Sequence, residues 1–518
     1  MFGKLGFVSD ALNTDAAVGA VPGSGAVPNA DSDTQFGLAR GLEGNAPKKR
    51  VCLALFGVLL FAFTYIHQDY SWGSSVSRLD LFHAVFSHHT LKIDAYHTNT
   101  TDKALFEKHY YSDKAPGTVA LAFPAFSIGT GILKLAGEPL ESKRGWLVSS
   151  WMGCAGSLAI LTALGAVALF AWLRRWVPER IALIVTLATY LGSMPFTYAT
   201  IMFSHAFVVG LLSLALWAIA GPLERTSSSL NAQPPFAETK KWRRRDLLAG
   251  FCCGSVVASE FTAGLIVYGV FLLQFIRGMR EAVRFSLAAV LPVLLIPAYS
   301  WVCFRNPFTV GYSFQAAFPE MKEGLFGIQW PNVQTAFNLL CSPARGLFFW
   351  SPFFLMAFVG YHKLYQESRR MFWFTYVFPL LQIIAISGYS WDWKAGNALG
   401  PRYLAPMLPF LALPCAFGVR RFPKLGLALA AMSMMLTGVG TVVNGTPGYQ
   451  TNPLLELHLP ALKQGEYVHN IGGVLGLKGH WQMVPLLIVV SIGITYLWRQ
   501  TAPGRTSIHG QRELPTPC

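Results

Sequence analysis

The residues best suited to chemistry fall within the segment 68–145. Asp80 and His83 come early in it, and Asp113 and Lys114 stand side by side further on. A carboxylate can take a proton from a hydroxyl group, and a neighbouring cation can neutralise an anionic leaving group such as phosphate. The alternative is a hydrated loop whose charges simply face water. Composition alone does not choose between these two interpretations.

Two arginines add candidate phosphate-binding groups. Arg402 falls at the predicted start of an apolar stretch, where it can pair with a lipid-linked phosphate. Arg345 follows Ser342 and Pro343, which predict a helix start because Ser is a good N-cap and Pro suits the first helical position. A helix N-terminus with an arginine beside it predicts a phosphate site. The alternative for Ser342 is an ordinary capped helix.

Two aromatic side chains precede Arg402. Trp391 and Trp393 precede Arg402 in a short polar stretch. Their rings can stack on the face of a sugar, or they can belong to the aromatic belt that marks a membrane interface. Both interpretations are consistent with the sequence.

The elements that must position these residues are apolar. Of the 518 residues, 53% are hydrophobic and 13% are charged, and the mean hydropathy is +0.40. A soluble globular chain has about 25% charged residues. The composition excludes a soluble enzyme, a disordered chain and a nucleic-acid-binding domain. The eight cysteines follow no metal-ligand spacing, so neither a zinc site nor a disulfide framework is expected.

Apolar stretches of this kind predict an all-α polytopic integral membrane protein with about twelve transmembrane helices. We expect these near 51–67, 146–173, 180–199, 202–221, 247–260, 262–276, 285–304, 346–364, 371–389, 402–420, 424–443 and 482–498. Thr118–Leu133 is left out as a juxtamembrane or re-entrant segment, because it is short, contains Pro124 and glycines, and would reverse the charge pattern if it spanned.

Charge sets the expected orientation. The net charge is +15, and clusters such as Lys240–Arg245 anchor loops on the cytoplasmic side. We therefore expect a multi-pass cell (inner) membrane protein with cytoplasmic termini. We expect a disordered N-terminal tail at 1–47, a transmembrane domain at 48–499 and a C-terminal tail at 500–518. The first outer loop, 68–145, holds most of the candidate catalytic residues. Further outer segments are 305–345, 390–401 and 444–481.

The first outer loop is expected to contain an interfacial helix at Ser77–His89. Apolar residues recur there at spacings of three and four, while Asp80 and His83 lie on a different face. The loop resembles the first periplasmic loop of the GT-C glycosyltransferases, which include protein O-mannosyltransferases and the aminoarabinose transferases of lipid A. Arg78-Leu79-Asp80 matches the acidic position before the interfacial helix, and Ser112-Asp113-Lys114-Ala115-Pro116-Gly117 matches an acidic-Lys-Pro-Pro-like motif.

The sequence departs from that pattern at two positions: Leu81 replaces a second acidic residue and Ala115 replaces the first proline. The segments around Arg345 and from Trp391 to Arg402 are also similar to segments in that family. The resemblance covers the chain from about the first to the tenth predicted helix.

The resemblance implies an enzyme that transfers a sugar from a polyprenyl-phosphate donor to a lipid, glycan or protein acceptor at the outer (periplasmic) face, with inversion. Asp80 would be the general base and Asp113 would orient Lys114 or the acceptor. Lys114, Arg402 and Arg345 would hold the donor phosphate. The substrate-contact candidates are Trp391, Trp393, His83 and Tyr111. A divalent metal such as Mg²⁺ or Mn²⁺, if one binds, would have Asp80 as a ligand.

The main alternative function is a membrane transporter or lipid flippase without transferase activity. Transporters often carry an inverted repeat and charges within their spans. We find no repeat and few such charges in this sequence. A GT-C-like scaffold that has lost activity is the third interpretation, because the second acidic residue is missing.

Overall fold

The computed structural model describes residues 49–68, 73–223 and 236–502, without the side chains of 220–242. The described elements belong to one unit, Gly44–Cys518. The predicted N-terminal tail and nearly all of the predicted C-terminal tail lie outside the described residues.

Helices dominate this unit. The helices that make up the predicted spans are α2 (Lys49–Tyr65), α6 (Ile160–Leu173), α7 (Glu179–Leu191), α8 (Met194–Tyr198), α9 (His205–Leu223), α10 (Phe236–Ser259), α11 (Gly264–Arg277), α12 (Met279–Val293), α13 (Leu295–Phe304), α15 (Leu347–Trp350), α16 (Met356–Glu367), α17 (Arg369–Ser387), α18 (Leu408–Arg421), α19 (Pro423–Asn444) and α22 (Val484–Gln500).

The elements of the predicted outer segments are α3 (Ser74–His88), α4 (Gly117–Leu135), α14 (Val333–Cys341), α20 (Leu459–Gln464), α21 (Ile471–Val474) and the strands β2 (Lys103–Phe106), β3 (His109–Ser112) and β4 (His469–Asn470). Two further elements lie at the borders of predicted spans: β1 (Ile66–His67) ends the predicted span 51–67, and α5 (Lys143–Gly153) lies mostly within the predicted span 146–173.

Every predicted span overlaps helical structure, and the protein is an integral membrane protein. Seven described helical segments are long and apolar enough to cross a membrane: Gly117–Leu135, Lys143–Leu173, Met279–Phe304, Arg369–Ser387, Arg402–Arg421, Pro423–Asn444 and Gly479–Gln500. The prediction of about twelve spans counted shorter helices as well, such as α2, which has 17 residues.

Helix α4 differs from the prediction for Thr118–Leu133, because it reaches the length and hydropathy of a span. Pro124 lies inside it without ending it. Its neighbours are α3, α5 and α10, and Gly117 abuts Ser259 at the end of α10, whereas Gly129 faces Met152 in α5. The helix therefore packs along α5, beside the outer elements.

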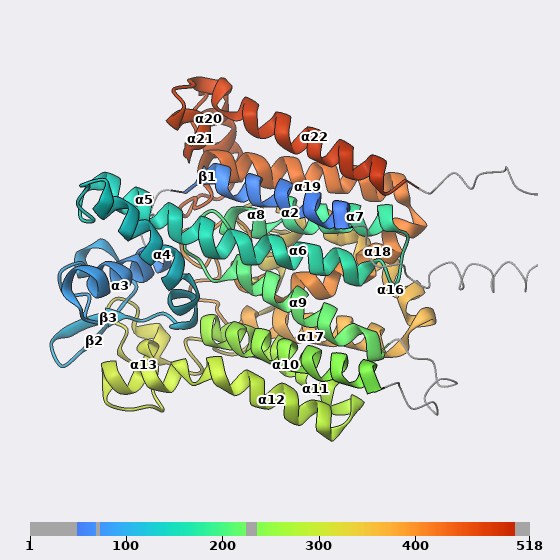
Figure 1. Cartoon of the computed structure of the whole chain (residues 1–518), viewed down its shortest axis with the longest axis horizontal. Helices are drawn as coiled ribbons and strands as arrows, with labels where there is room; N and C mark the ends of the chain where they lie inside the picture. The colour runs from blue at the N-terminus through green and yellow to red at the C-terminus, as the bar shows by residue number, and fades with distance from the viewer. Residues whose placement is uncertain (1–48, 69–72, 224–235, 503–518) are drawn as a thin grey trace, which may run out of the picture. The chain divides into compact units, whose positions relative to one another are not determined.

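Neighbouring helices of the bundle pack in a consistent order. Helix α10 lies between α9 and α12, α6 lies between α2 and α9, and α16 packs on α18. Figure 1 shows these long helices side by side, with α3, α13 and the strands β2 and β3 at one end, which we call the hairpin end. Gly165 in α6 and Gly210 in α9 face each other, and only such small residues let two helix backbones approach so closely.

Two short sheets organise the hairpin end. Strands β2 and β3 form an antiparallel hairpin in which Lys103 pairs with Ser112. Glu107 and Lys108, at the turn, both have positive φ, as a two-residue hairpin turn requires. Strand β1 pairs with β4, so that the segment after α2 is tied to the last outer segment.

Two predicted helix starts were wrong. Ser342 is the C-cap of α14, and the next helix, α15, begins only at Leu347. The fourth predicted span begins at His205 and not at residue 202, because a non-helical stretch precedes α9. At the tenth span, Arg402 opens a 3₁₀ segment, η8 (Arg402–Met407), that leads into α18.

A candidate active-site pocket

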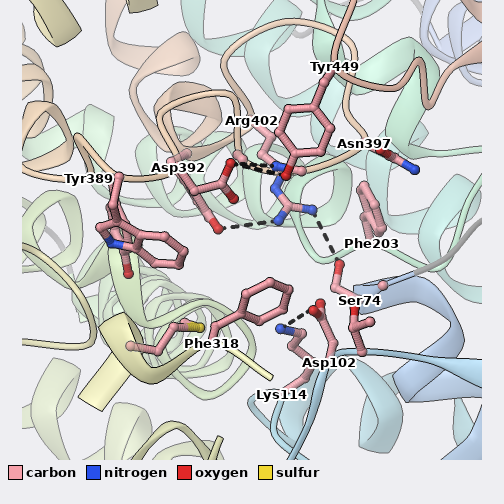
Figure 2. Close-up of a pocket in the computed structure, with 17 residues that line it drawn as sticks. Ser74, Asp102, Lys114, Phe203, Phe318, Tyr389, Asp392, Asn397, Arg402 and Tyr449 are labelled. Carbon is pink, nitrogen blue, oxygen red and sulfur yellow. Dashed lines mark hydrogen bonds and ion pairs between the residues drawn. The ribbon is translucent and has the colours of Figure 1, made fainter. Parts of the chain in front are cut away.

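A pocket of about 310 Å³ lies where the outer segments meet the bundle. It brings together side chains from segments far apart in sequence (Figure 2). Its lining consists of Gly73, Ser74, Thr101, Asp102, Lys114, Phe203, Phe318, Met321, Tyr389, Trp391, Asp392, Ala395, Gly396, Asn397, Arg402, Tyr403 and Tyr449. Of the predicted site residues, Lys114, Arg402 and Trp391 lie in this wall.

Lys114 is held between two carboxylates. Its Nζ lies 2.8 Å from Oδ2 of Asp102 and 3.2 Å from Oδ2 of Asp113, and its side chain is only 8% exposed. Burial alone would lower the pKa of Lys114, but the two carboxylates outweigh it and raise that pKa. Lys114 is therefore a fixed, permanently charged cation at neutral pH.

The β2–β3 hairpin accounts for this arrangement. Because Lys103 pairs with Ser112, the preceding Asp102 and the following Asp113 emerge together at the open end of the ladder. A hydrogen bond of 2.8 Å between the Ser77 and Ser112 hydroxyls fixes β3 against α3. The Gln315 side chain donates to Asp113 Oδ2 at 2.7 Å. Asp113 itself lies behind Lys114 and not in the pocket wall.

The pKa values of the two carboxylates shift in opposite directions. Burial raises the pKa of Asp113 to about 6, although Lys114 acts in the opposite direction. For Asp102 burial also raises the pKa, but Lys114 outweighs it, so the pKa lies below its usual value. Asp102 is thus an ionised carboxylate that faces the pocket.

Arg402 supplies the second cation of the pocket. It is 9% exposed, its guanidinium donates to the Ser74 hydroxyl at 3.4 Å and to the Tyr403 hydroxyl at 3.3 Å, and its Nε has no hydrogen-bond partner. The guanidinium also lies 5.1 Å from the centres of the Phe203 and Tyr403 rings. Figure 2 shows Arg402 on one side of the pocket and Lys114 with Asp102 on the facing side.

A third cation, Arg78, strengthens the positive potential. Its guanidinium donates to the carbonyl of Ser74, the residue that also contacts Arg402, and it is 3% exposed. Three buried cations near one cavity favour an anionic ligand, because charges act strongly where water is excluded.

Asp392 is the other carboxylate in the pocket wall. The Tyr449 hydroxyl donates to its Oδ1 at 3.4 Å and the Gly396 amide does so at 3.3 Å. Burial raises its pKa. No ion pair with Asp392 is found in the described part of the chain, so it differs from Asp102, which is paired with Lys114.

The two predicted tryptophans are placed differently. The Trp391 indole lines the pocket, and its N–H donates to the Gly327 carbonyl at 2.9 Å, which fixes the ring. Trp393 is not part of the pocket wall, and the Lys394 ammonium lies 5.9 Å from its ring centre. Only Trp391 is positioned for contact with a ligand in this pocket.

Asp80, the predicted general base, lies outside the pocket wall. Its side chain is fully buried in α3, where Oδ1 accepts a hydrogen bond of 3.1 Å from Asn99 and Oδ2 has no partner. Burial raises its pKa to about 8, although Asn99 opposes the shift. Residues Ser74–Ala84 of α3 are buried on every face, so the polar face expected at the surface is covered.

His83 and Tyr111 also lie away from the pocket wall. The His83 ring is fully buried and stacks on Trp146 with 3.6 Å between ring centres, and burial lowers its pKa to about 4. Tyr111 packs edge-on against Phe304 at 5.5 Å. Both side chains have packing roles in this structure.

Arg345 has a structural role that differs from the predicted one. It is fully buried, and its guanidinium donates to five main-chain carbonyls, those of Ala344, Lys394, Gly396, Pro447 and Gly448. The expected helix N-terminus is absent at this point, and the arginine instead joins the segment after Trp391 to the one before Tyr449. It supports the pocket wall from behind.

Among the described residues, no group of three or more His, Cys, Asp and Glu side chains is placed to hold a metal ion. Asp80, the predicted metal ligand, has Asn99 as its polar neighbour. We assign no residue to a metal.

Sequence reasoning did not assign site roles to Asp102, Asp392, Ser74, Tyr403 and Tyr449. A signal existed for Asp392, which stands between two tryptophans in a short polar stretch. No sequence signal existed for Tyr449, because nothing in the sequence places the segment after α19 beside the stretch around Asp392.

Comparisons with known proteins gave a match only among solved structures. No model of a known protein family matches the chain, and neither does any curated protein. The structure is similar to ArnT from Cupriavidus metallidurans in the apo state, with a TM-score of 0.47 and 13% identity. It is also similar to the same protein bound to undecaprenyl phosphate, with a TM-score of 0.44 and 14% identity. Each match covers 91% of this chain and 76% of the other.

Proposed function

We propose that this protein is a GT-C-type glycosyltransferase that transfers a sugar from a polyprenyl-phosphate donor to an acceptor hydroxyl at the outer face of the membrane. The observation that carries the proposal is the pair of fixed cations, Lys114 and Arg402, on facing sides of one pocket whose wall also contains the Asp392 carboxylate. The resemblance of the segments 112–117 and 391–402 to that family supports it.

The donor phosphate binds between Lys114 and Arg402. When the bond between the sugar C1 and the phosphate oxygen breaks, the phosphate keeps the electron pair and its charge changes from −1 to −2. Cations that are already in place stabilise the product-like charge more than the starting charge, which lowers the barrier. Asp102 and Asp113 keep the Lys114 ammonium in position and charged.

The general base is Asp392 and not Asp80. Inversion requires the acceptor oxygen to attack C1 from the side opposite the phosphate, and its proton goes to a carboxylate that is not already paired with a phosphate-binding cation. Asp102 forms an ion pair with Lys114, whereas the hydrogen bonds to Asp392 found among the described residues come from Tyr449 and Gly396. Burial raises the pKa of Asp392, which makes it a better proton acceptor at neutral pH.

The Trp391 ring, fixed by its bond to Gly327, provides a flat surface beside the reacting sugar. The outer-face location and the cytoplasmic termini belong to the same proposal and rest on the distribution of lysine and arginine. The acceptor is a lipid, a glycan or a protein.

The test compares Asp392→Asn, Asp102→Asn and Asp80→Asn in membranes that contain labelled polyprenyl-phosphate sugars. Asp392→Asn should lower sugar transfer by about 10²–10⁴-fold, as expected for loss of a general base. Its binding of undecaprenyl phosphate, the lipid in the ArnT complex, should stay within about twofold of wild type.

Asp80→Asn should retain transfer, because the side chain is outside the pocket. Wild-type-like transfer by a folded Asp392→Asn protein would contradict the assignment of the base. Movement of the labelled donor across vesicles by the wild-type protein, without release of polyprenyl phosphate, would favour a transporter and contradict the proposed function.

A further inference from the structure

A second pocket, of about 460 Å³, adjoins the first. Its lining residues are Val76, Ala95, Tyr96, Thr98, Asn99, Glu141, Lys143 and Trp146. None of these residues belongs to the wall of the first pocket. A cavity of this size holds a small organic ligand.

The two pockets share one partition. Ser74 faces the first pocket and Val76 the second, and likewise Thr101 faces the first and Thr98 the second. The Thr100 hydroxyl donates to the Gly73 carbonyl at 3.0 Å, and this bond joins the segment 98–101 to the start of α3. The second pocket is therefore lined in part by residues two or three positions from residues that line the first.

The lining of the second pocket combines hydrogen-bonding groups with the aromatic rings of Tyr96 and Trp146. The Glu141 carboxylate is half-exposed and accepts from the Ser87 hydroxyl at 2.5 Å and the Tyr96 hydroxyl at 2.7 Å. Burial raises its pKa, but these hydrogen bonds outweigh burial, so Glu141 is ionised. Thr98 and Asn99 are exposed, and the Asn99 amide nitrogen donates to Asp80.

The wall is rigid as well as polar. His83 is fully buried and stacks on the Trp146 ring from behind at 3.6 Å. Asp80, also fully buried, holds Asn99 in place. These two residues, which the sequence singled out but the reactive pocket does not use, act as supports for the second pocket.

We propose that this second pocket binds a carbohydrate, namely the sugar part of the acceptor. Sugar hydroxyls can donate to Glu141 and to the Asn99 amide oxygen and can accept from the Lys143 ammonium. A ring of a pyranose can pack against Trp146, as apolar faces do in ligand sites lined by aromatic residues. The inference rests on the proposed function, since it assigns the acceptor to the cavity beside the transfer site.

The test is direct binding, without turnover. The labelled wild-type protein in nanodiscs is applied to an array of mono- to tetrasaccharides, and Thr98→Trp and Glu141→Gln are applied in parallel. Thr98 is exposed, so the tryptophan should fill the cavity without disturbing the core. Both variants should lose at least tenfold in affinity for the saccharides that the wild-type protein binds.

Arg402→Met provides the matched control, because it alters only the first pocket. It should keep saccharide binding and lose binding of undecaprenyl phosphate. Saccharide binding that is absent from the wild type, or equal in a folded Thr98→Trp protein, would overturn the inference. Undecaprenyl phosphate binding by the same wild-type sample tests the proposed function separately.

Discussion

The Lys114 ammonium lies 2.8 Å from the Asp102 carboxylate, because the two residues flank the β2–β3 hairpin in sequence and meet at its open end. The pair is buried, and its lysine faces the same cavity as Arg402. The hairpin register thus creates a cation site that no single stretch of sequence contains.

Removing either cation should weaken binding of the donor phosphate. Lys114→Met and Arg402→Met each remove a charge without adding one, and loss of a charged hydrogen bond costs about 1.5–3 kcal/mol, or about 10- to 150-fold in affinity. Binding of undecaprenyl phosphate to the purified proteins measures this. Lys108→Met, on the exposed hairpin turn, is the control. Unchanged affinity in both pocket variants would remove the cation pair from the proposal.

Replacing Arg345 should affect stability before binding. Arg345→Met leaves five carbonyls, two of them in buried and three in partly buried hydrogen bonds, without their donor, and loss of a partner costs about 1–3 kcal/mol for each buried group that stays unpaired. We expect a clear fall in the thermal unfolding midpoint, measured in detergent. Arg305→Met, which breaks an exposed ion pair with Glu107, should change it little. A stable Arg345→Met protein that has lost undecaprenyl phosphate binding would instead support the prediction that Arg345 holds the donor phosphate.

Stability should fall as pH rises, because of Asp80. Burial raises its pKa from 3.8 to about 8 in the folded protein. Between these values the folded state binds one proton more than the unfolded chain, so the free energy of unfolding decreases by up to about 1.4 kcal/mol per pH unit. The contribution is complete below pH 4 and is lost above pH 8.

Asp80→Asn should flatten this dependence. The thermal midpoints of the variant at pH 5.5 and pH 8.5 should differ less than those of the wild type, whereas Glu107→Gln, at an exposed turn, should leave the difference unchanged. Parallel wild-type and Asp80→Asn profiles would show that Asp80 is ionised in the folded protein.

The distribution of lysine and arginine predicts that Thr98 and Ser228 lie on opposite sides of the membrane. Ser228 lies outside the described residues. Thr98→Cys and Ser228→Cys, each in a cysteine-free background, should react oppositely with an impermeant thiol reagent on intact cells, and only Thr98→Cys should be labelled. The reverse pattern would place the pocket on the cytoplasmic side.

Hydropathy predicted where the helices lie, because burial in a bilayer demands long apolar stretches. Helix starts were less predictable. Ser342-Pro343 has the composition of a helix start, yet Ser342 ends α14. Local preferences of one or two residues are weak compared with packing over a whole helix.

The residues of the site were predictable only where a local sequence motif marks them. Lys114 and Arg402 stand in recognisable motifs, and both reach the pocket. Asp80 also stands in such a motif, but the loop that carries Asn99 covers it. Asp102 reaches the pocket through strand pairing, and a periodic pattern does not reveal the register of a short hairpin.

The pairing of β1 with β4 has a consequence for biosynthesis. The Tyr65 hydroxyl at the end of α2 donates to the Gln482 carbonyl at 2.5 Å, and α2 packs along α22. The segment that follows α2 is therefore anchored by residues that lie 417 positions later in the chain. Insertion of α2 alone does not fix this segment, which is held in place only once β4 and α22 have been synthesised.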